Sequence, residues 1–204
     1  MVELNRILLA DCMDVMKDIP DKYFELAIVD PPYGIGNKLI QGGTWAKDRK
    51  KEYSGWDSVP DELYFKTLMK ISKNQIIWGG NYFNLPPCRG FIIWDKPSMR
   101  IPTMADCEFA WTSFDTVAKI FKVNQEKGKD RIHLSQKPVA LYRRILQKYA
   151  KPGDKIIDTH SGSGSCAIAC HLEHFDFLAI EKDPAYHLAS VKRFDEIRSQ
   201  GVLF

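Results

Sequence analysis

Long hydrophobic runs are missing from this sequence of 204 residues, whose uninterrupted apolar stretches reach about four or five residues. A membrane-spanning helix needs about 20 consecutive apolar residues, so a membrane span is excluded. Acidic residues interrupt the N-terminal segment before any apolar stretch of secretory length, and we expect no cleaved export signal. The sequence therefore predicts a protein without a membrane partner.

Paired cysteines are also missing: the five cysteines include no Cys-x-x-Cys motif, and their number is odd. This argues against a disulfide framework and favours a reducing, cytoplasmic location. Cys166, Cys170, His171 and His174 fall close together on an expected helix, but zinc sites usually draw their ligands from separated segments. We therefore expect buried thiols beside surface imidazoles there, and no metal.

A large excess of one charge is the third absence, because the formal net charge is only +3. That balance excludes a strongly basic architectural nucleic-acid binder. The content of 45% hydrophobic and 27% charged residues is too apolar for a disordered chain. We found no internal repeat and no low-complexity tract, and residues 1–204 are expected to form a single domain with a sizeable core.

Short, continuous apolar runs alternate with helical patterns along the chain. Continuous apolarity indicates strands that are buried on both faces, as in a parallel sheet. The six predicted strands of this kind cover residues 6–10, 26–29, 75–78, 91–94, 155–157 and 177–180. Residues 107–112 are predicted to form a further strand, antiparallel and near an edge of the sheet.

Helical patterns lie between these strands. The predicted helices run from the capping-box spacing at Ser58 and Asp61 to Ile71, from Pro138 to Tyr149, over residues 163–173, and from Asp183-Pro184 onward. In the last helix Leu188, Val191, Phe194 and Ile197 are expected to face the core. Strands alternating with helices predict a three-layer α/β domain.

Two stretches escape the pattern and are candidates for functional loops. Residues 34–57 are rich in Gly, Lys and aromatic side chains, and residues 115–137 hold six Lys and Arg against three Asp and Glu. Loops longer than about 15 residues in compact domains are usually functional or disordered.

The first chemical motif is Asp30-Pro31-Pro32-Tyr33, which follows the predicted strand 26–29 directly. Ligands of open α/β sheets bind at the carboxyl ends of strands. The prolines stiffen the backbone and leave carbonyl acceptors free, Asp30 adds a carboxylate, and Tyr33 adds a flat ring. Such a set suits a planar group that carries an NH2, because two acceptors and a stacking surface converge on it.

The second motif, Asp-Thr-His-Ser-Gly-Ser-Gly at residues 158–164, follows the strand 155–157 and opens a helix. Glu181 ends the next strand, where an acid can hold the two hydroxyls of a ribose. Residues 162–167 also satisfy Gly-x-Gly-x-x-Ala, so a nicotinamide-dinucleotide site remains an alternative. Asp158 favours S-adenosylmethionine, because a carboxylate suits an amino group better than a pyrophosphate.

Together the two motifs resemble the amino-group DNA methyltransferases, which methylate exocyclic nitrogens of adenine or cytosine. The catalytic motif precedes the glycine motif, and this order resembles the circularly permuted β class. The likeness covers about residues 4–198. It implies a Rossmann-like S-adenosylmethionine-dependent methyltransferase fold whose sheet is mostly parallel, with an antiparallel edge strand. It also implies that Asp30, Pro31, Pro32 and Tyr33 grip a flipped base.

The resemblance further implies the residues that contact the cofactor S-adenosylmethionine. These are Asp11, Cys12, Asp30, Lys137, Asp158, His160, Ser161, Gly162, Ser163, Gly164, Glu181 and Lys182. Ser135 and Pro138 flank Lys137 in the segment expected near the cofactor's carboxylate. Thr159 and His160 stand where the family usually has Pro and Phe. Methyl transfer is direct, so Cys12 is not expected to act as a nucleophile.

As a member of this family the protein is expected to act on double-stranded DNA as a monomer or homodimer, within a restriction-modification system. Residues 34–57 and 96–131 are the candidate recognition loops. The expected phosphate contacts are Lys38, Lys47, Arg49, Lys50 and Lys51. Asp in the first position of the catalytic motif resembles the adenine-N6 enzymes, whereas Ser is typical of the cytosine-N4 enzymes.

Four alternatives stay open on the sequence alone. Cytosine N4 is one, because both amines present two N–H donors. An RNA or protein-amide methyltransferase is the second, although the amide enzymes tend to carry Asn in place of Asp30. A nicotinamide oxidoreductase is the third, and it leaves the Asp30–Tyr33 motif without a use. A non-catalytic binding module is the fourth.

Overall fold

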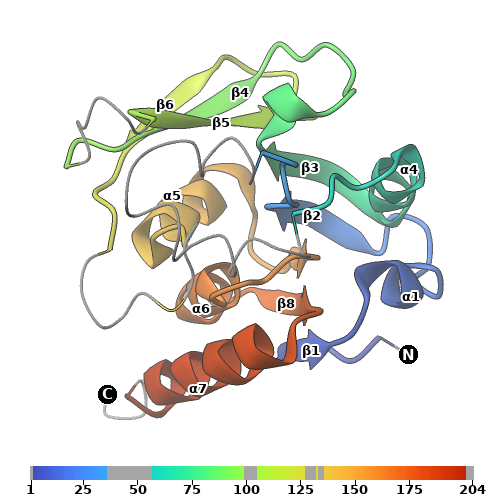
Figure 1. Cartoon of the computed structure of the whole chain (residues 1–204), viewed down its shortest axis with the longest axis vertical. Helices are drawn as coiled ribbons and strands as arrows, with labels where there is room; N and C mark the ends of the chain where they lie inside the picture. The colour runs from blue at the N-terminus through green and yellow to red at the C-terminus, as the bar shows by residue number, and fades with distance from the viewer. Residues whose placement is uncertain (1, 36–56, 99–104, 127–131, 133–135, 201–204) are drawn as a thin grey trace.

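The computed structural model describes residues 2–35, 57–98, 105–126, 132 and 136–200. These residues form an eight-stranded sheet in the order β1-β8-β7-β2-β3-β5-β4-β6, with helices on both faces (Figure 1). The strands are β1 Arg6–Leu9, β2 Phe24–Val29, β3 Ser72–Trp78, β4 Phe91–Asp95, β5 Cys107–Thr112, β6 Lys119–Lys122, β7 Lys155–Asp158 and β8 Asp176–Glu181. This is the three-layer α/β architecture that the sequence predicts.

Five α-helices are described, in two layers. α1 (Cys12–Met16) and α4 (Glu62–Ile71) cover one face, and α5 (Val139–Tyr149), α6 (Ser165–Leu172) and α7 (Pro184–Gln200) cover the other (Figure 1). α6 is buried almost all round, because its small residues allow close packing against the sheet and its neighbours.

The central strands explain why the sheet is stable. In β2, Ile28 belongs to the core under α5–α7, whereas Ala27 and Val29 belong to the core under α1 and α4. All three are fully buried. Burial of an aliphatic side chain such as Ile28 or Val29 contributes roughly 1.5–3 kcal/mol. The continuous apolar run in the sequence therefore reports a strand with both faces covered.

The order in which strands are added reverses between β7 and β2. These two strands are parallel neighbours, with Ala27 paired to Ile157. The chain leaves β2 for β3 through α4 on one face, and leaves β7 for β8 through α6 on the other. Such a topological switch point is where open α/β sheets bind ligands. The register brings Asp30, just after β2, beside the residues that follow Asp158.

Two strands differ from the prediction. Cys107–Thr112 (β5) is antiparallel as expected, but it lies between β3 and β4 and not at an edge. The edge belongs to β6, which the sequence pattern does not predict. β6 is four residues long and alternates in exposure, with Ile120 66% exposed, so it has no continuous apolar run. The expected loop 96–131 therefore contains two strands of the sheet.

Helix boundaries differ as well. Asp61, and not Ser58, caps α4, since the Asp61 carboxylate accepts from the N–H of Tyr64 at 2.9 Å. α6 begins at Ser165, because the residues before it form the turn of the glycine motif. Leu188 was expected to face the core but is 71% exposed, as α7 packs through its other faces.

No helix in the described part of the chain is both long enough and apolar enough to cross a membrane. Within the same residues, no group of three or more His, Cys, Asp and Glu side chains is placed to hold a metal ion. Cys166 and Cys170 are buried in α6, and the ring of His171 packs against Phe194.

Candidate active site

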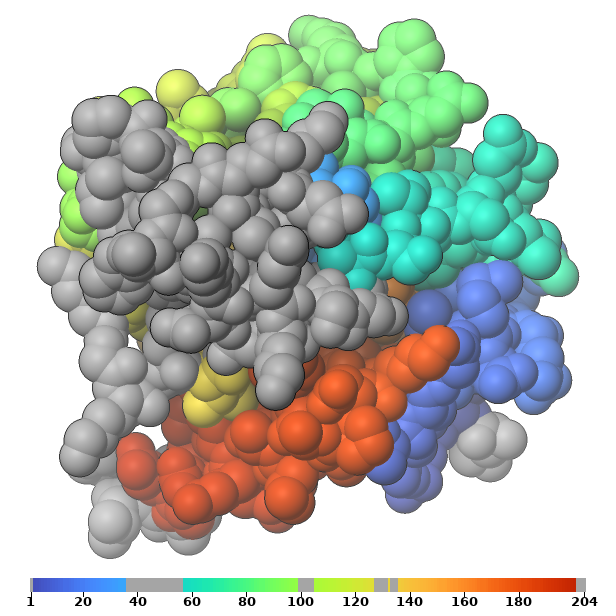
Figure 2. Space-filling model, in the orientation of Figure 1, coloured from blue at the N-terminus to red at the C-terminus, as the bar shows by residue number. Residues whose placement is uncertain are grey.

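A cavity of about 610 Å³ opens at the carboxyl ends of β1, β2, β7 and β8. Its size lies within the range of about 300–1,000 Å³ that is typical of ligand pockets. Residues of α1, of the segment before α4 and of the turn before α7 line its rim. These segments (blue, cyan and orange) meet on one face of the molecule in Figure 2.

The glycine motif forms one wall of the cavity through backbone contacts. Glu181, at the end of β8, accepts from the N–H of Gly162 at 2.7 Å and from the N–H of Asp183 at 2.8 Å. Gly164 has φ +73°, and a Cβ atom added there would lie 3.2 Å from the Cβ atom of Ser190 on α7, away from the cavity. Gly164 therefore serves the packing of α6 against α7, whereas Gly162 faces the cavity.

Two titratable groups next to this wall are uncharged at neutral pH, of which Asp158 is buried and His160 is half-buried. Burial, with smaller contributions from the charges of Asp30 and Glu181, raises the pKa of Asp158 to about 8, although Asp158 accepts from the N–H of His160 at 3.1 Å. Burial lowers the pKa of His160 to about 4. The Nδ1 atom of His160 lies 3.0 Å from the Thr159 hydroxyl. His160 therefore behaves as a neutral ring at neutral pH.

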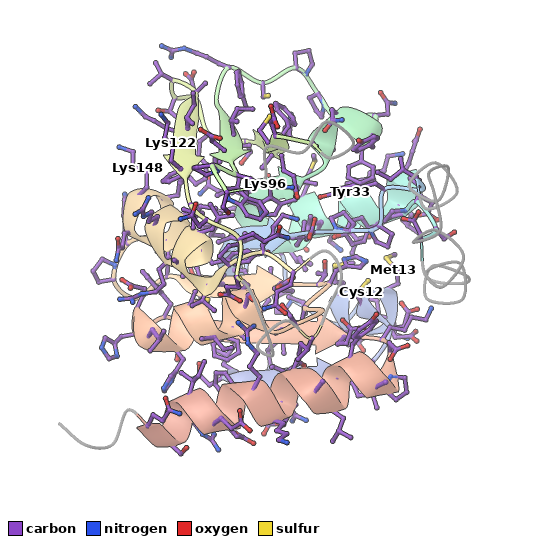
Figure 3. The ribbon with its side chains drawn as sticks, turned by 60° about the vertical axis from the view of Figure 1, so that its left-hand side comes forward. Cys12, Met13, Tyr33, Lys96, Lys122 and Lys148 are labelled. Carbon is purple, nitrogen blue, oxygen red and sulfur yellow. The ribbon has the colours of Figure 1, made fainter. Side chains whose placement is uncertain are left out.

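The cavity is also lined by an exposed ion pair. Asp11 caps α1 by accepting from the N–H of Met13 at 2.9 Å, and it accepts from Lys182 Nζ at 2.8 Å. The hydrogen bond from Lys182 is the main reason why the pKa of Asp11 is lowered. Burial raises the pKa of the neighbouring Cys12 thiol to about 11, so this thiol is protonated and unsuited to nucleophilic attack. Figure 3 labels Cys12 and Met13 at the start of α1.

Asp30 stands at the inner end of the cavity, between two hydrogen-bond donors. Its Oδ1 atom accepts from the Tyr33 hydroxyl at 2.6 Å, and its Oδ2 atom accepts from Lys137 Nζ at 2.5 Å. Lys137 also contacts Glu108 at 3.1 Å, and its ammonium group lies 5.0 Å from the centre of the Trp78 ring. The two contacts fix the plane of the Asp30 carboxylate, while each oxygen keeps a second lone pair for another donor.

The ring of Tyr33 is held by aromatic side chains and by a glycine. Tyr82 stacks on it with a centroid distance of 5.1 Å and an interplanar angle of 16°, and Phe83 meets it edge-on at 6.1 Å. A Cβ atom at Gly79 would come within 2.2 Å of the Tyr33 ring. Gly79 has φ +67°, so glycine meets both the backbone and the space requirement.

The structure thus brings together most of the residues that the sequence singles out. Lining the one cavity are Asp11, Cys12, Asp30, Pro32, Lys137, His160, Ser161, Gly162, Ser163, Glu181 and Lys182. Pro31, Tyr33, Asp158 and Gly164 do not line it, although Tyr33 and Asp158 contact or neighbour residues that do. The expected phosphate contacts Lys38, Lys47, Arg49, Lys50 and Lys51, together with Ser135, lie outside the described residues.

Several site residues carry no signal that sequence reasoning recognises. Tyr64 of α4 lines the cavity and shares a hydrogen bond of 2.7 Å with the Thr159 hydroxyl. Glu108 of β5 contacts Lys137, and Lys96 contacts Glu108 at 2.5 Å. An aromatic residue on an amphipathic helix and a charged residue in a strand are both common, so only the fold reveals these positions.

The cavity suits the cofactor that the resemblance implies. The Ser161 hydroxyl is buried at its wall and has no hydrogen-bond partner among the described residues, as expected for a group that awaits a ligand. Carboxylates of Asp11, Glu181 and Asp30 surround the same space and can accept from hydroxyl and ammonium donors. Neutral His160 supplies an apolar ring face beside them.

Comparison with known proteins agrees with this geometry. The N6_N4_Mtase family, described as DNA methylase, matches residues 77–192. The chain is 27% identical to the type II methyltransferase M.HinfI of Haemophilus influenzae, over 96% of this chain and 69% of that protein. It is 24% identical to the type II methyltransferase M2.MboI of Moraxella bovis, over 92% and 86% respectively.

Solved structures share the fold. The complex of M1.HpyAVI with S-adenosylmethionine superposes with a TM-score of 0.63 and 18% identity, covering 93% of this chain and 98% of that one. The cytosine-N4-specific PvuII DNA methyltransferase superposes with a TM-score of 0.64 and 15% identity, covering 98% of this chain and 92% of that one.

The fold is therefore that of the S-adenosylmethionine-dependent DNA methyltransferases. The chain belongs to the DNA methylase family, whose match spans more than half of its length. This confirms the predicted class, an amino-group DNA methyltransferase.

Proposed function

We propose that this protein transfers a methyl group from S-adenosylmethionine to the N6 amine of adenine in double-stranded DNA, at a specific sequence. The observation that carries the proposal is that Asp30 and the glycine wall at Gly162 line the same cavity. A methyl donor seated on that wall and an amine held by Asp30 would therefore be neighbours.

The cofactor half of the cavity is assigned from the donors and acceptors that face it. We assign the ribose hydroxyls to Glu181, whose two oxygens each keep a lone pair beside the backbone contacts. We assign the amino group of the cofactor to the region of Asp158. A cation beside this buried carboxyl lowers its pKa, so Asp158 is ionised when the cofactor is bound. When bound, S-adenosylmethionine supplies an electrophilic methyl group on a sulfonium.

The target half of the site acts on a base that has rotated out of the duplex. Asp30 and the carbonyl of Pro31 are proposed to accept the two N–H groups of its amine. These acceptors favour the tetrahedral nitrogen and stabilise the positive charge that grows on it as it bonds to the methyl carbon. Tyr33 and the stacked Tyr82 form an aromatic wall next to Asp30, and stacking on such a wall is worth about 1–3 kcal/mol per base.

Lys137 has a different part in this proposal from the one that the resemblance implies. It contacts Asp30, Glu108 and the Tyr33 hydroxyl, and its side chain is 1% exposed. Its immediate role is to hold the catalytic carboxylate, although it also lines the cavity. The lysine-rich stretch of residues 38–51 is proposed to neutralise phosphates, so binding to DNA should weaken steeply with salt.

The choice of adenine over cytosine rests on Asp30 as the first residue of its motif, which is typical of adenine-N6 enzymes. Cytosine N4 is the second candidate, because the PvuII enzyme, which is cytosine-N4-specific, shares the fold. Both amines offer two N–H donors, so hydrogen bonding alone does not discriminate between them.

Expression in a bacterial strain without DNA methylation tests the proposal. Long-read sequencing of the genomic DNA should report modified adenine at a defined sequence, and nucleoside analysis should identify N6-methyladenine. N4-methylcytosine would refute the adenine assignment alone. Unmodified DNA from cells that contain folded protein able to bind the cofactor would refute the proposal as a whole.

A further inference from the structure

Four charged side chains of alternating sign connect the catalytic carboxylate to Lys96, the residue after β4. Asp30 contacts Lys137 at 2.5 Å, Lys137 contacts Glu108 at 3.1 Å, and Glu108 contacts Lys96 at 2.5 Å. They come from the loop after β2, the segment before α5, from β5 and from the residue after β4. Figure 3 labels Lys96, at one end of this series, and Tyr33, whose hydroxyl contacts Asp30 at the other end.

Burial makes the series more than a surface ion-pair network. The side chains of Lys137, Lys96, Asp30 and Glu108 are 1%, 12%, 17% and 24% exposed, respectively. A buried lysine tends to lose its proton, because a charge is poorly solvated away from water. The two carboxylates outweigh this effect, and the pKa of Lys137 is raised above its ordinary value. The four charges cancel, so the cluster is neutral as a whole.

Asp30 cannot provide this compensation alone during the reaction. The proposed target amine donates to the Asp30 carboxylate and develops positive charge next to it. Part of the negative charge that stabilises Lys137 is then shared with the substrate. Glu108 touches Lys137 independently of that event, and Lys137 together with Lys96 lowers the pKa of Glu108 although burial opposes this.

We propose that Glu108 is a positioning residue for methyl transfer, which keeps Lys137 charged and in contact with Asp30 while the carboxylate holds the amine. This inference rests on the proposed function. Glu108 touches neither the amine nor the cofactor, and it acts only through Lys137. Its loss should therefore lower kcat and leave both KM values unchanged.

Glu108→Gln tests the proposal, because it removes the charge and nearly preserves the shape. Glu25→Gln is a matched control: Glu25 contacts Lys73 at 3.1 Å and Lys155 at 3.2 Å, its side chain is 21% exposed, and it lies near the other end of β2. The control should keep wild-type kinetics. Glu108→Gln should lower kcat about tenfold with both KM values within twofold of wild type.

The pH profile separates positioning from mere destabilisation. Without Glu108 the pKa of Lys137 falls, so the alkaline limb of kcat should move to lower pH by about one unit. The other titratable groups facing the cluster are Asp158, Tyr33 and Tyr142. Asp158 is present in both proteins and lies beside the same bound cofactor, so it adds no difference between the two profiles. Both tyrosines stay neutral because their pKa values are raised well above 10.

A lower kcat with an unmoved alkaline limb, or wild-type kinetics in Glu108→Gln, would overturn the inference. Glu108→Asp keeps the charge, so it should restore part of kcat and bring the alkaline limb close to its wild-type pH. Should Glu108→Gln fail to fold, Glu108→Asp provides the test, because its alkaline limb should move to lower pH by a smaller amount. An alkaline limb at the wild-type pH in Glu108→Asp would then overturn the inference. Wild-type protein that transfers no methyl group would instead refute the proposed function, so the two failures are distinguishable.

Discussion

Gly79→Ala should uncouple methyl transfer from cofactor binding. The added Cβ atom would lie 2.2, 2.5 and 2.6 Å from three atoms of the Tyr33 ring, so that ring must withdraw by roughly 1–2 Å to reach ordinary contact. Tyr33 donates to Asp30 and stacks on Tyr82, so its displacement disturbs both the acceptor and the aromatic wall. A misplacement of about 1 Å in an active site can cost about 100-fold in rate.

The stability cost of this substitution can be separated from its effect on the site. Gly79 has φ +67°, and a left-handed conformation costs a residue with a side chain about 1–2 kcal/mol. Gly153 has φ +89°, but a Cβ atom there would meet nothing within 4 Å. Gly153→Ala is therefore the matched control. Each variant should lower Tm by a few degrees, at about 2–4 °C per kcal/mol.

Transfer of radiolabelled methyl groups to unmethylated DNA measures the outcome. Gly79→Ala should lose about 100-fold in kcat and keep the cofactor Kd within threefold, because Gly79 does not line the cavity. Gly153→Ala should keep wild-type kcat. Equal losses in the two variants, or a Gly79→Ala enzyme within twofold of wild type, would refute the argument about Tyr33.

Three further predictions concern the cofactor half of the cavity. Glu181→Gln should weaken S-adenosylmethionine binding about tenfold in calorimetry, because hydrogen bonds to a charged acceptor are roughly twice as strong as neutral ones; unchanged affinity would remove Glu181 from the site. His160→Phe should keep the cofactor Kd within about threefold at pH 7, because a pKa of about 4 leaves His160 neutral there; a large loss would show that its nitrogen atoms bind the ligand. For Asp158, folding raises the pKa from the ordinary value near 4 to about 8, so the native state holds a proton that the unfolded chain releases. The contribution of Asp158 to the free energy of unfolding is highest at acid pH and is lost as pH rises from about 4 to about 8. Urea unfolding at several pH values should show a smaller fall in the free energy of unfolding over this range for ligand-free Asp158→Asn than for the wild type.

The sequence predicts the parts of the fold that have strong local signals. Continuous apolar runs mark β2 and β7, and the motifs at Asp30 and Gly162 stand directly after them. Because parallel strands present their carboxyl ends at one edge, two motifs more than 100 residues apart could be placed together in advance.

What could not be predicted depends on partners that are distant in sequence. β6 forms an edge strand from a mixed Lys-Ile-Phe-Lys sequence, which pairs with β4 and packs Phe121 against the core. The contacts of Lys137 with Asp30 and Glu108 could not be predicted, because only the fold shows that Glu108 on β5 lies 3.1 Å from it. Tyr82 and Gly79 are part of the site because both contact the ring of Tyr33, which is distant from them in the sequence.

The central claim is that Asp30 presents an exocyclic amine to a methyl donor bound in the same cavity. Mass spectrometry of nucleosides provides the most direct test, after purified protein has reacted with unmethylated DNA and S-adenosylmethionine carrying a deuterated methyl group. The wild-type enzyme should place the label on an amino nitrogen, whereas Asp30→Ala should bind the cofactor and transfer no label. Label on a ring carbon, or undiminished transfer by Asp30→Ala, would contradict the account.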